Sequence, residues 1–371
     1  MLEESGNTMS DELKRAQGAA LGYLMGDCIG MPTEWLTAKE AKEAYGMIGG
    51  VGAASDTHPF WPGRETGLPT NVTDDFLSLS TQLAVAGDGF EESLSRLLTD
   101  DSESELDSDS EMESKPAAPS DADVDAEPSA RANRLTQVIE GAESVAGTDL
   151  KNIPMRSQGV HRGYAGDALP EALLIGMTRS SKRDDTLLLT EVAAFISSVD
   201  GTTSQWEGSA LLALTVSSII DGASIWDAVD SSLASVAQTR AIGARTPASS
   251  VIARVLEGRD KTKKMDEKAL TPYLKHSIGL STSVHEAVPA AILVALLYRD
   301  NPFVGLCNVA QTGGASSYVG AMAGALLGAS LPDRTVPYRQ LDQINADYRE
   351  RVLAAVNQFE DRHGPARILG S

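Results

Sequence analysis

Residues 13–25 read LKRAQGAALGYLM, and the nine residues that follow them, 26–34, read GDCIGMPTE. Apolar and small residues recur through the first part at helical spacing, which predicts an α-helix over residues 13–25. Alanine and glycine inside such a helix let a neighbouring backbone approach closely, as in a bundle with buried central helices. Glycines and a proline then end the helix, which predicts a loop mouth that holds Asp27 and Glu34.

Further helices are predicted along the chain. Residues 186–198 and 209–220 repeat this pattern, residues 284–298 and 318–327 are almost wholly apolar, and residues 341–359 form the last clear helical segment. The alternation typical of strands is hard to find. The last of these segments, 341–359, is amphipathic and is expected to cover the outside of the bundle. We therefore predict an all-α fold, a compact bundle of more than ten helices, formed as one domain over residues 13–359 with tails at 1–12 and 360–371.

One acidic segment, residues 100–132, interrupts this domain. The 371-residue chain has a net charge of −21, and residues 100–128 hold twelve Asp and Glu against one lysine. About half of the net charge therefore comes from a segment that contains no aromatic residue. Its apolar surface is too small to offset the entropy of ordering, so we predict a disordered insertion. Either a solvating loop or an acidic docking or phosphorylation tract fits this composition.

Composition also limits the classes of partner. The chain has no basic stripe of the kind that binds phosphates of nucleic acids, so no nucleic-acid partner is predicted. No stretch approaches the ~20 apolar residues that cross a bilayer, and residues 1–12 are polar and acidic, so we expect no membrane contact and a cytoplasmic protein. The two cysteines, Cys28 and Cys307, indicate neither a disulfide framework nor a zinc site.

A second short polar segment consists of Thr73, Asp74 and Asp75, ahead of an apolar helical run over residues 76–85. A hydroxyl followed by two carboxylates offers the oxygen ligands that Mg²⁺ prefers. The structural alternative is that Thr73 or Asp74 caps the helix, while Asp75 is a first-turn acid that complements the helix dipole. The motif by itself leaves both interpretations open.

Taken together, four motifs resemble one known family. They are Gly-Asp-x-x-Gly-x-Pro-x-Glu at 26–34, Thr-Asp-Asp at 73–75, Ser-Val-His-Glu-Ala-Val-Pro-Ala-Ala at 283–291, and Gly-Gly at 313–314 before a helix of small residues. This combination resembles the ADP-ribosylglycohydrolase family over about residues 13–359, with the acidic insertion as an extra. The resemblance implies an all-α fold and hydrolysis of ADP-ribose conjugates at the anomeric carbon of the ribose, with two Mg²⁺ ions.

The resemblance also implies roles for particular residues. Thr73, Asp74 and Asp75 would be metal ligands, and Glu34 together with Asp75 would supply the catalytic carboxylates. The substrate-binding residues would be Asp27, Gly313, Gly314, Ser316 and Ser317. The structural alternatives are that Glu34 is an exposed loop acid and that Asp27 is a helix-end acid satisfied by nearby backbone.

The sequence departs from the family where the second pair of metal-binding carboxylates is expected. The family follows Gly-Gly with Asp-Thr-Asp-Thr, whereas residues 315–318 here are Ala, Ser, Ser and Tyr. Phe76 stands where the Thr-Asp-Asp motif is usually followed by Thr. Two Mg²⁺ ions bring four positive charges that need several carboxylates, so we expect one weak Mg²⁺ site rather than two.

Several functions remain open on these grounds. The resemblance implies an ADP-ribosylglycohydrolase-like protein that hydrolyses the glycosidic bond of an ADP-ribose-type conjugate. The alternatives are a non-catalytic pseudoenzyme that binds ADP-ribose or a partner, and a purely structural protein. The implied partners are an ADP-ribose-like small molecule or an ADP-ribosylated protein. In each case we expect the loops that hold Glu34, residues 73–75 and residues 313–317 to converge at one end of the bundle.

Overall fold

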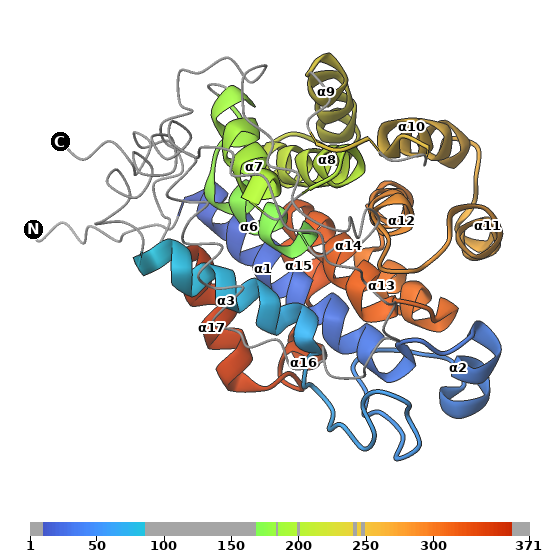
Figure 1. The fold of residues 1–371 in the computed structure, drawn as a ribbon. Coiled ribbons are helices and arrows are strands. Elements are labelled where there is room, and N and C mark those ends of the chain that lie inside the picture. Colours follow the sequence, from blue (N-terminus) through green and yellow to red (C-terminus); the bar gives the residue numbers. More distant parts are fainter. Residues whose placement is uncertain are drawn as a thin grey trace, which may run out of the picture.

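Helices account for the regular structure of the chain in the computed structural model, which describes residues 10–85, 168–182, 185–198, 201–239, 243–245 and 249–357 (Figure 1). These residues form fifteen α-helices, a 3₁₀ turn and a π-helical turn, and no β-strand. The predicted all-α fold of more than ten helices is therefore confirmed. The predicted acidic insertion and the tail at 360–371 lie outside the described residues.

In chain order the helices are α1 (Asp11–Gly30), the 3₁₀ turn η1 (Met31–Thr33), α2 (Ala38–Tyr45), α3 (Asn71–Val85), α6 (Leu169–Thr178), α7 (Asp185–Ser198), α8 (Thr203–Ile220), α9 (Ile225–Gln238), α10 (Val251–Thr262), α11 (Glu267–Tyr273), the π turn η5 (Leu274–Ile278), α12 (Val284–Leu297), α13 (Pro302–Thr312), α14 (Ser316–Ser330), α15 (Pro332–Thr335), α16 (Tyr338–Leu341) and α17 (Ala346–Asn357).

Helices α1 and α14 form a central antiparallel pair (Figure 1). Small residues recur at every fourth position of α1 and meet small residues of α14 in reverse order: Gly18 with Gly328, Gly22 with Gly324, Gly26 with Gly320, and Gly30 with Ser316. A Cβ atom on Gly26 would lie 1.9 Å from the carbonyl oxygen of Gly320, which belongs to the backbone and cannot rotate away. The two backbones are therefore in direct contact, and this contact brings the end of α1 to the start of α14.

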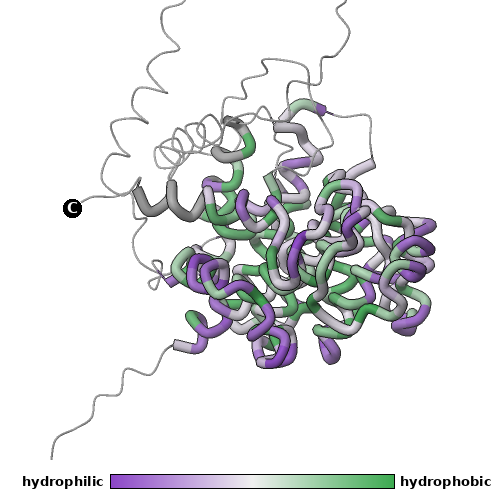
Figure 2. Tube along the Cα trace, turned by 90° about the horizontal axis from the view of Figure 1, so that it is seen from below, coloured by the Kyte–Doolittle hydropathy of each residue, from purple (hydrophilic) through white to green (hydrophobic). Residues whose placement is uncertain are grey.

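The other helices surround this pair. Helices α3 and α17 pack together on one flank, α6 packs on α8, and α12 packs on both α10 and α14 (Figure 1). Hydrophobic residues gather in the interior and hydrophilic residues at the periphery (Figure 2). Among the residues that the structure describes, no helix combines the length and apolar character that crossing a bilayer requires.

Three local predictions are wrong. The predicted helix 341–359 is interrupted, because the Asn345 side chain accepts the backbone N–H of Asp347 at 3.0 Å and starts α17, while α16 has already ended. Asp27 is not at a loop mouth, because α1 continues to Gly30 and buries it. Neither Thr73 nor Asp74 caps α3: the helix begins at Asn71, and the Thr70 hydroxyl accepts the N–H of Val72 at 3.2 Å.

Candidate functional site

Three segments far apart in sequence meet near the end of α1. The backbone N–H of Trp35 donates to the Gly314 carbonyl at 2.6 Å, and the N–H of Gly314 donates to the Leu36 carbonyl at 2.8 Å. These bonds join the loop after η1 to the start of α14. The first turn of α3 reaches the same region through Thr73, whose hydroxyl donates to Asp27 at 2.7 Å. The expected convergence of the three segments is therefore present.

Asp27 is a buried anchor for the first turn of α3. Its carboxylate accepts the backbone N–H groups of Thr70 and Thr73 at 3.1 Å and their hydroxyls at 2.8 and 2.7 Å. Burial raises the pKa of Asp27 to about 6, and the hydrogen bonds from both threonines oppose that rise. Thr70 was not predicted as a site residue, although its position one residue before the helix is typical of a capping threonine.

Glu34 is a second buried carboxylate, with 4% of its surface exposed, so it is not the exposed loop acid of the structural alternative. It accepts the N–H of Ser317 at 2.6 Å and the Ser317 hydroxyl at 2.5 Å. Burial raises the pKa of Glu34 to about 7, the bonds from Ser317 oppose the rise, and the nearby charge of Asp27 adds to it. Glu34 therefore caps α14 from a distant segment, where its charge faces the positive end of the helix dipole.

The residues expected to bind substrate near α14 are brought together, and their polar groups are used within the fold. Gly313 and Gly314 have φ angles of 72° and 67°, and a Cβ on Gly313 would lie 2.1 Å from the Leu36 carbonyl oxygen. Only glycine therefore fits this turn. The Ser316 hydroxyl is buried, donates to the Gly30 carbonyl at 2.9 Å and lies 3.1 Å from the Thr33 hydroxyl.

The two carboxylates of the Thr-Asp-Asp motif diverge. Asp74 is exposed and accepts the hydroxyl of Tyr348, on α17, at 3.0 Å. Asp75 is half-buried, and its charge lies close enough to Tyr23 to raise the pKa of the tyrosine. Adjacent positions on a helix do not face each other, which is why consecutive aspartates point to different neighbours.

Tyr23 links these acids to the core. Burial raises its pKa well above the ordinary value, and the neighbouring groups Asp27, Tyr318, Asp75 and Glu171 raise it further. Its hydroxyl donates to the Val72 carbonyl at 3.0 Å. Its ring stacks on Phe76 at a centroid distance of 4.8 Å, so the phenylalanine that replaces the family's threonine is a buried packing residue here. No sequence pattern pointed to Tyr23.

A loop over residues 54–64 lies beside Glu34. His58 is buried in this loop, and its Nδ1 accepts the backbone N–H groups of Phe60 and Trp61 at 3.2 and 2.9 Å, which places the proton of the neutral ring on Nε2. Burial lowers the pKa of His58, and the backbone of Glu34 partly offsets that effect. The loop is thus held in one conformation next to the Glu34 segment.

The donor groups do not fit a binuclear magnesium site. Within the described ranges, no three side chains of His, Cys, Asp or Glu are grouped so that they could hold a metal ion. The Thr73 hydroxyl donates to Asp27, Asp74 accepts from Tyr348, and Glu34 accepts from Ser317. The start of α14 offers Ser316 and Ser317 in place of carboxylates. Among the described residues, four positive charges would therefore lack the anionic ligands they need.

The chain is similar in sequence to a known family and in fold to a solved structure. The model of a family described as ADP-ribosylglycohydrolase matches residues 8–366. A solved structure described as an ADP-ribosylglycohydrolase-related protein complex is 18% identical, with a TM-score of 0.51, and the match covers 95% of this chain and 99% of that chain. No curated protein matches the sequence. The structural likeness bears on the fold, and the family match covers the converging segments described above.

Proposed function

The chain belongs to the ADP-ribosylglycohydrolase family, and we propose that it is a member that binds an ADP-ribose-type ligand without hydrolysing it. The observation that carries this proposal is the contact between Glu34 and Ser317, because it commits the candidate catalytic carboxylate to capping α14. A general base must reach the proton of its water, and this carboxylate would first have to leave two short hydrogen bonds.

The state of the metal-binding residues supports the same proposal. Thr73, Asp74 and Asp75 retain oxygen ligands for at most one weakly held Mg²⁺, since the second set of carboxylates is absent from the start of α14. We therefore expect little activation of water at this site. The chain's own residues would bind and orient the ligand, which is either free ADP-ribose or an ADP-ribosylated protein, and we place the protein in the cytoplasm.

Hydrolysis is the second candidate function, and one observation favours it. The pKa of Glu34, raised to about 7, suits a group that both takes and returns a proton near neutral pH. If Glu34 moves off Ser317 when ligand binds, the same carboxylate becomes available to water. This candidate differs from the first in a measurable way, because it requires turnover that depends on Glu34.

Two measurements on the full chain separate the candidates. Calorimetric titration with ADP-ribose reports binding, and release of ADP-ribose from modified arginine and serine substrates in Mg²⁺ reports hydrolysis. We expect binding with release at the background rate, both for the wild type and for Glu34→Gln. Robust Mg²⁺-dependent release that is lost in Glu34→Gln would establish a hydrolase and refute the proposal. Absence of ADP-ribose binding would favour a structural role.

A further inference from the structure

The loop over residues 54–64 closes on itself and ends in an arginine. The backbone N–H of Ala54 donates to the Arg64 carbonyl at 2.9 Å, and the N–H of Gly63 donates to the Ser55 carbonyl at 3.0 Å. The guanidinium of Arg64 lies over the Trp61 ring, 5.0 Å from its centroid. A cation held on an aromatic face in this way is restrained before any ligand arrives.

Three N–H donors of this loop are buried and have no hydrogen-bond acceptor within the described part of the chain: Nε2 of His58, Nε1 of Trp61 and Nε of Arg64. Among the described residues, the side chains of Trp61 and Arg64 form no hydrogen bond, and Arg64 forms no ion pair. Buried donors are nearly always satisfied, so three on one loop call for an acceptor that the described part of the protein does not supply. An arginine without an acidic partner is also unexpected in a chain with a net charge of −21.

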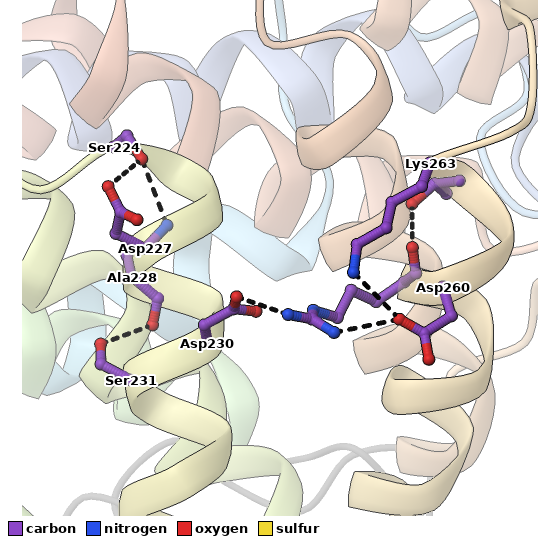
Figure 3. A network of polar contacts seen from close by, with 9 residues as sticks. Ser224, Asp227, Ala228, Asp230, Ser231, Asp260 and Lys263 are labelled. Carbon is purple, nitrogen blue, oxygen red and sulfur yellow. Dashed lines mark hydrogen bonds and ion pairs between the residues drawn. The ribbon is translucent and has the colours of Figure 1, made fainter.

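Two other arginines provide the comparison, because each also has a buried Nε without a partner. The guanidinium of Arg259 pairs with Asp230 and Asp260 in the network between α9 and α10 (Figure 3). Arg349 pairs with Asp342 at 3.8 Å. Both arginines have their charge compensated within the protein. Arg64 has the same partly buried setting without that compensation.

Arg64 lies on the side of the molecule that carries the Thr-Asp-Asp motif. Burial and Asp74 raise the pKa of Tyr348, the tyrosine that donates to Asp74, and the charge of Arg64 opposes that rise. The same charge opposes the rise that burial causes in the pKa of Cys28, next to Asp27. Trp61, under the guanidinium, follows Phe60, whose ring contacts Trp35 at a centroid distance of 6.2 Å. Trp35 in turn follows Glu34, so the loop borders the candidate site.

We propose that Arg64, held on Trp61, binds a phosphate group, and that this group is a phosphate of the ADP-ribose-type ligand of the neighbouring site. The identity of the ligand rests on the proposed function, whereas the phosphate chemistry rests on the loop. A guanidinium presents parallel N–H donors that match phosphate oxygens, and a phosphate accepts several hydrogen bonds at once. Free phosphate or pyrophosphate offers the same oxygens, so the experiment includes both sources.

The test uses the full chain and calorimetric titration with three probes: ADP-ribose, pyrophosphate, and adenosine, which has no phosphate. We expect Arg64→Gln to weaken ADP-ribose and pyrophosphate binding at least tenfold and to leave any adenosine binding unchanged. Trp61→Phe, which keeps the ring and removes the N–H donor, should cause a smaller loss. Arg259→Gln removes an arginine that is also partly buried but whose charge is paired with Asp230 and Asp260. This control should leave all three affinities unchanged.

The outcomes separate this inference from the proposed function. ADP-ribose binding that is unaffected by Arg64→Gln overturns the inference and leaves the proposed function standing. If the wild type does not bind ADP-ribose, the proposed function fails, and pyrophosphate binding that is lost in Arg64→Gln still supports a phosphate site. Absence of pyrophosphate and ADP-ribose binding overturns the inference. If circular dichroism shows that Arg64→Gln folds poorly, Arg64→Lys replaces it, because lysine keeps the charge and removes the guanidinium. Pyrophosphate and ADP-ribose affinities of Arg64→Lys equal to those of the wild type would overturn the role of the guanidinium.

Discussion

The carboxylate of Glu34 accepts both the backbone N–H and the hydroxyl of Ser317, at 2.6 and 2.5 Å, although the two residues are 283 positions apart. The contact ties the loop after α1 to the first turn of α14, beside the line of small residues where the two helices touch. Because the carboxylate is buried, its pKa is raised to about 7. One contact therefore stabilises the docking of two segments and makes that docking sensitive to pH near neutrality.

The first prediction concerns this pH dependence. The pKa of Glu34 in the folded protein, about 7, lies above its ordinary value of 4.5, so its contribution to stability is fully present below about pH 4.5 and is lost as the pH rises through 7. Between pH 5 and pH 8 the wild type should lose ~2 kcal/mol more unfolding free energy than Glu34→Gln. Denaturant unfolding at both pH values measures the difference. Equal pH slopes for the two proteins would contradict it.

A second prediction concerns the contact between α1 and α14. A Cβ on Gly22 would lie 2.1 Å from the Gly324 carbonyl oxygen, so Gly22→Ala must push the two helices apart. We expect a loss of about 3 kcal/mol of unfolding free energy or more, at the upper end of overpacking costs. Gly49→Ala is the matched control, because Gly49 is exposed and has nothing within 4 Å of the added atom. Thermal unfolding of both variants tests the idea, and equal melting temperatures would refute it.

A third prediction concerns metal binding at the Thr-Asp-Asp motif. Calorimetric titration should show at most one Mg²⁺ per chain, bound weakly, and Asp75→Ala should abolish that binding, because the described residues hold no group of acids that could replace it. Asp333→Ala removes an exposed acid on α15 and serves as the control. Two tight sites in the wild type would be incompatible with this prediction and would implicate other acids, such as Glu171.

The fourth prediction restores carboxylates at the start of α14. Ala315→Asp combined with Ser317→Asp places two acids at the family's spacing, with the second beside the Glu34 carboxylate. Without metal, like charges and burial should lower the melting temperature, and Mg²⁺ should raise it by more than it raises that of the wild type. The double variant Ala315→Asn with Ser317→Asn has similar shape without charge and should respond to Mg²⁺ no more than the wild type does. Equal responses of the two double variants would show that the acids form no metal site.

Much of the fold could be predicted because helical periodicity is a local property. Apolar spacing within single segments predicted α1, α7, α8, α12 and α14, and small residues predicted the close approach of buried helices. The predicted ends were less reliable. Thr70 starts α3 before the motif, and Asn345 interrupts the last predicted helix, since a capping side chain outweighs the periodicity around it.

The sequence by itself determined the helical class, the buried central helices and the residue types available at the site, including the absence of acids at 315–318. Only the tertiary structure decided what those residues do. Glu34 caps α14, Asp27 anchors α3, and Asp74 turns to Tyr348. The physical reason is that a side chain's hydrogen-bond partners depend on which distant segments pack beside it. Small residues predict that a helix is approached closely, but the sequence of one segment does not say that α1 lies against α14.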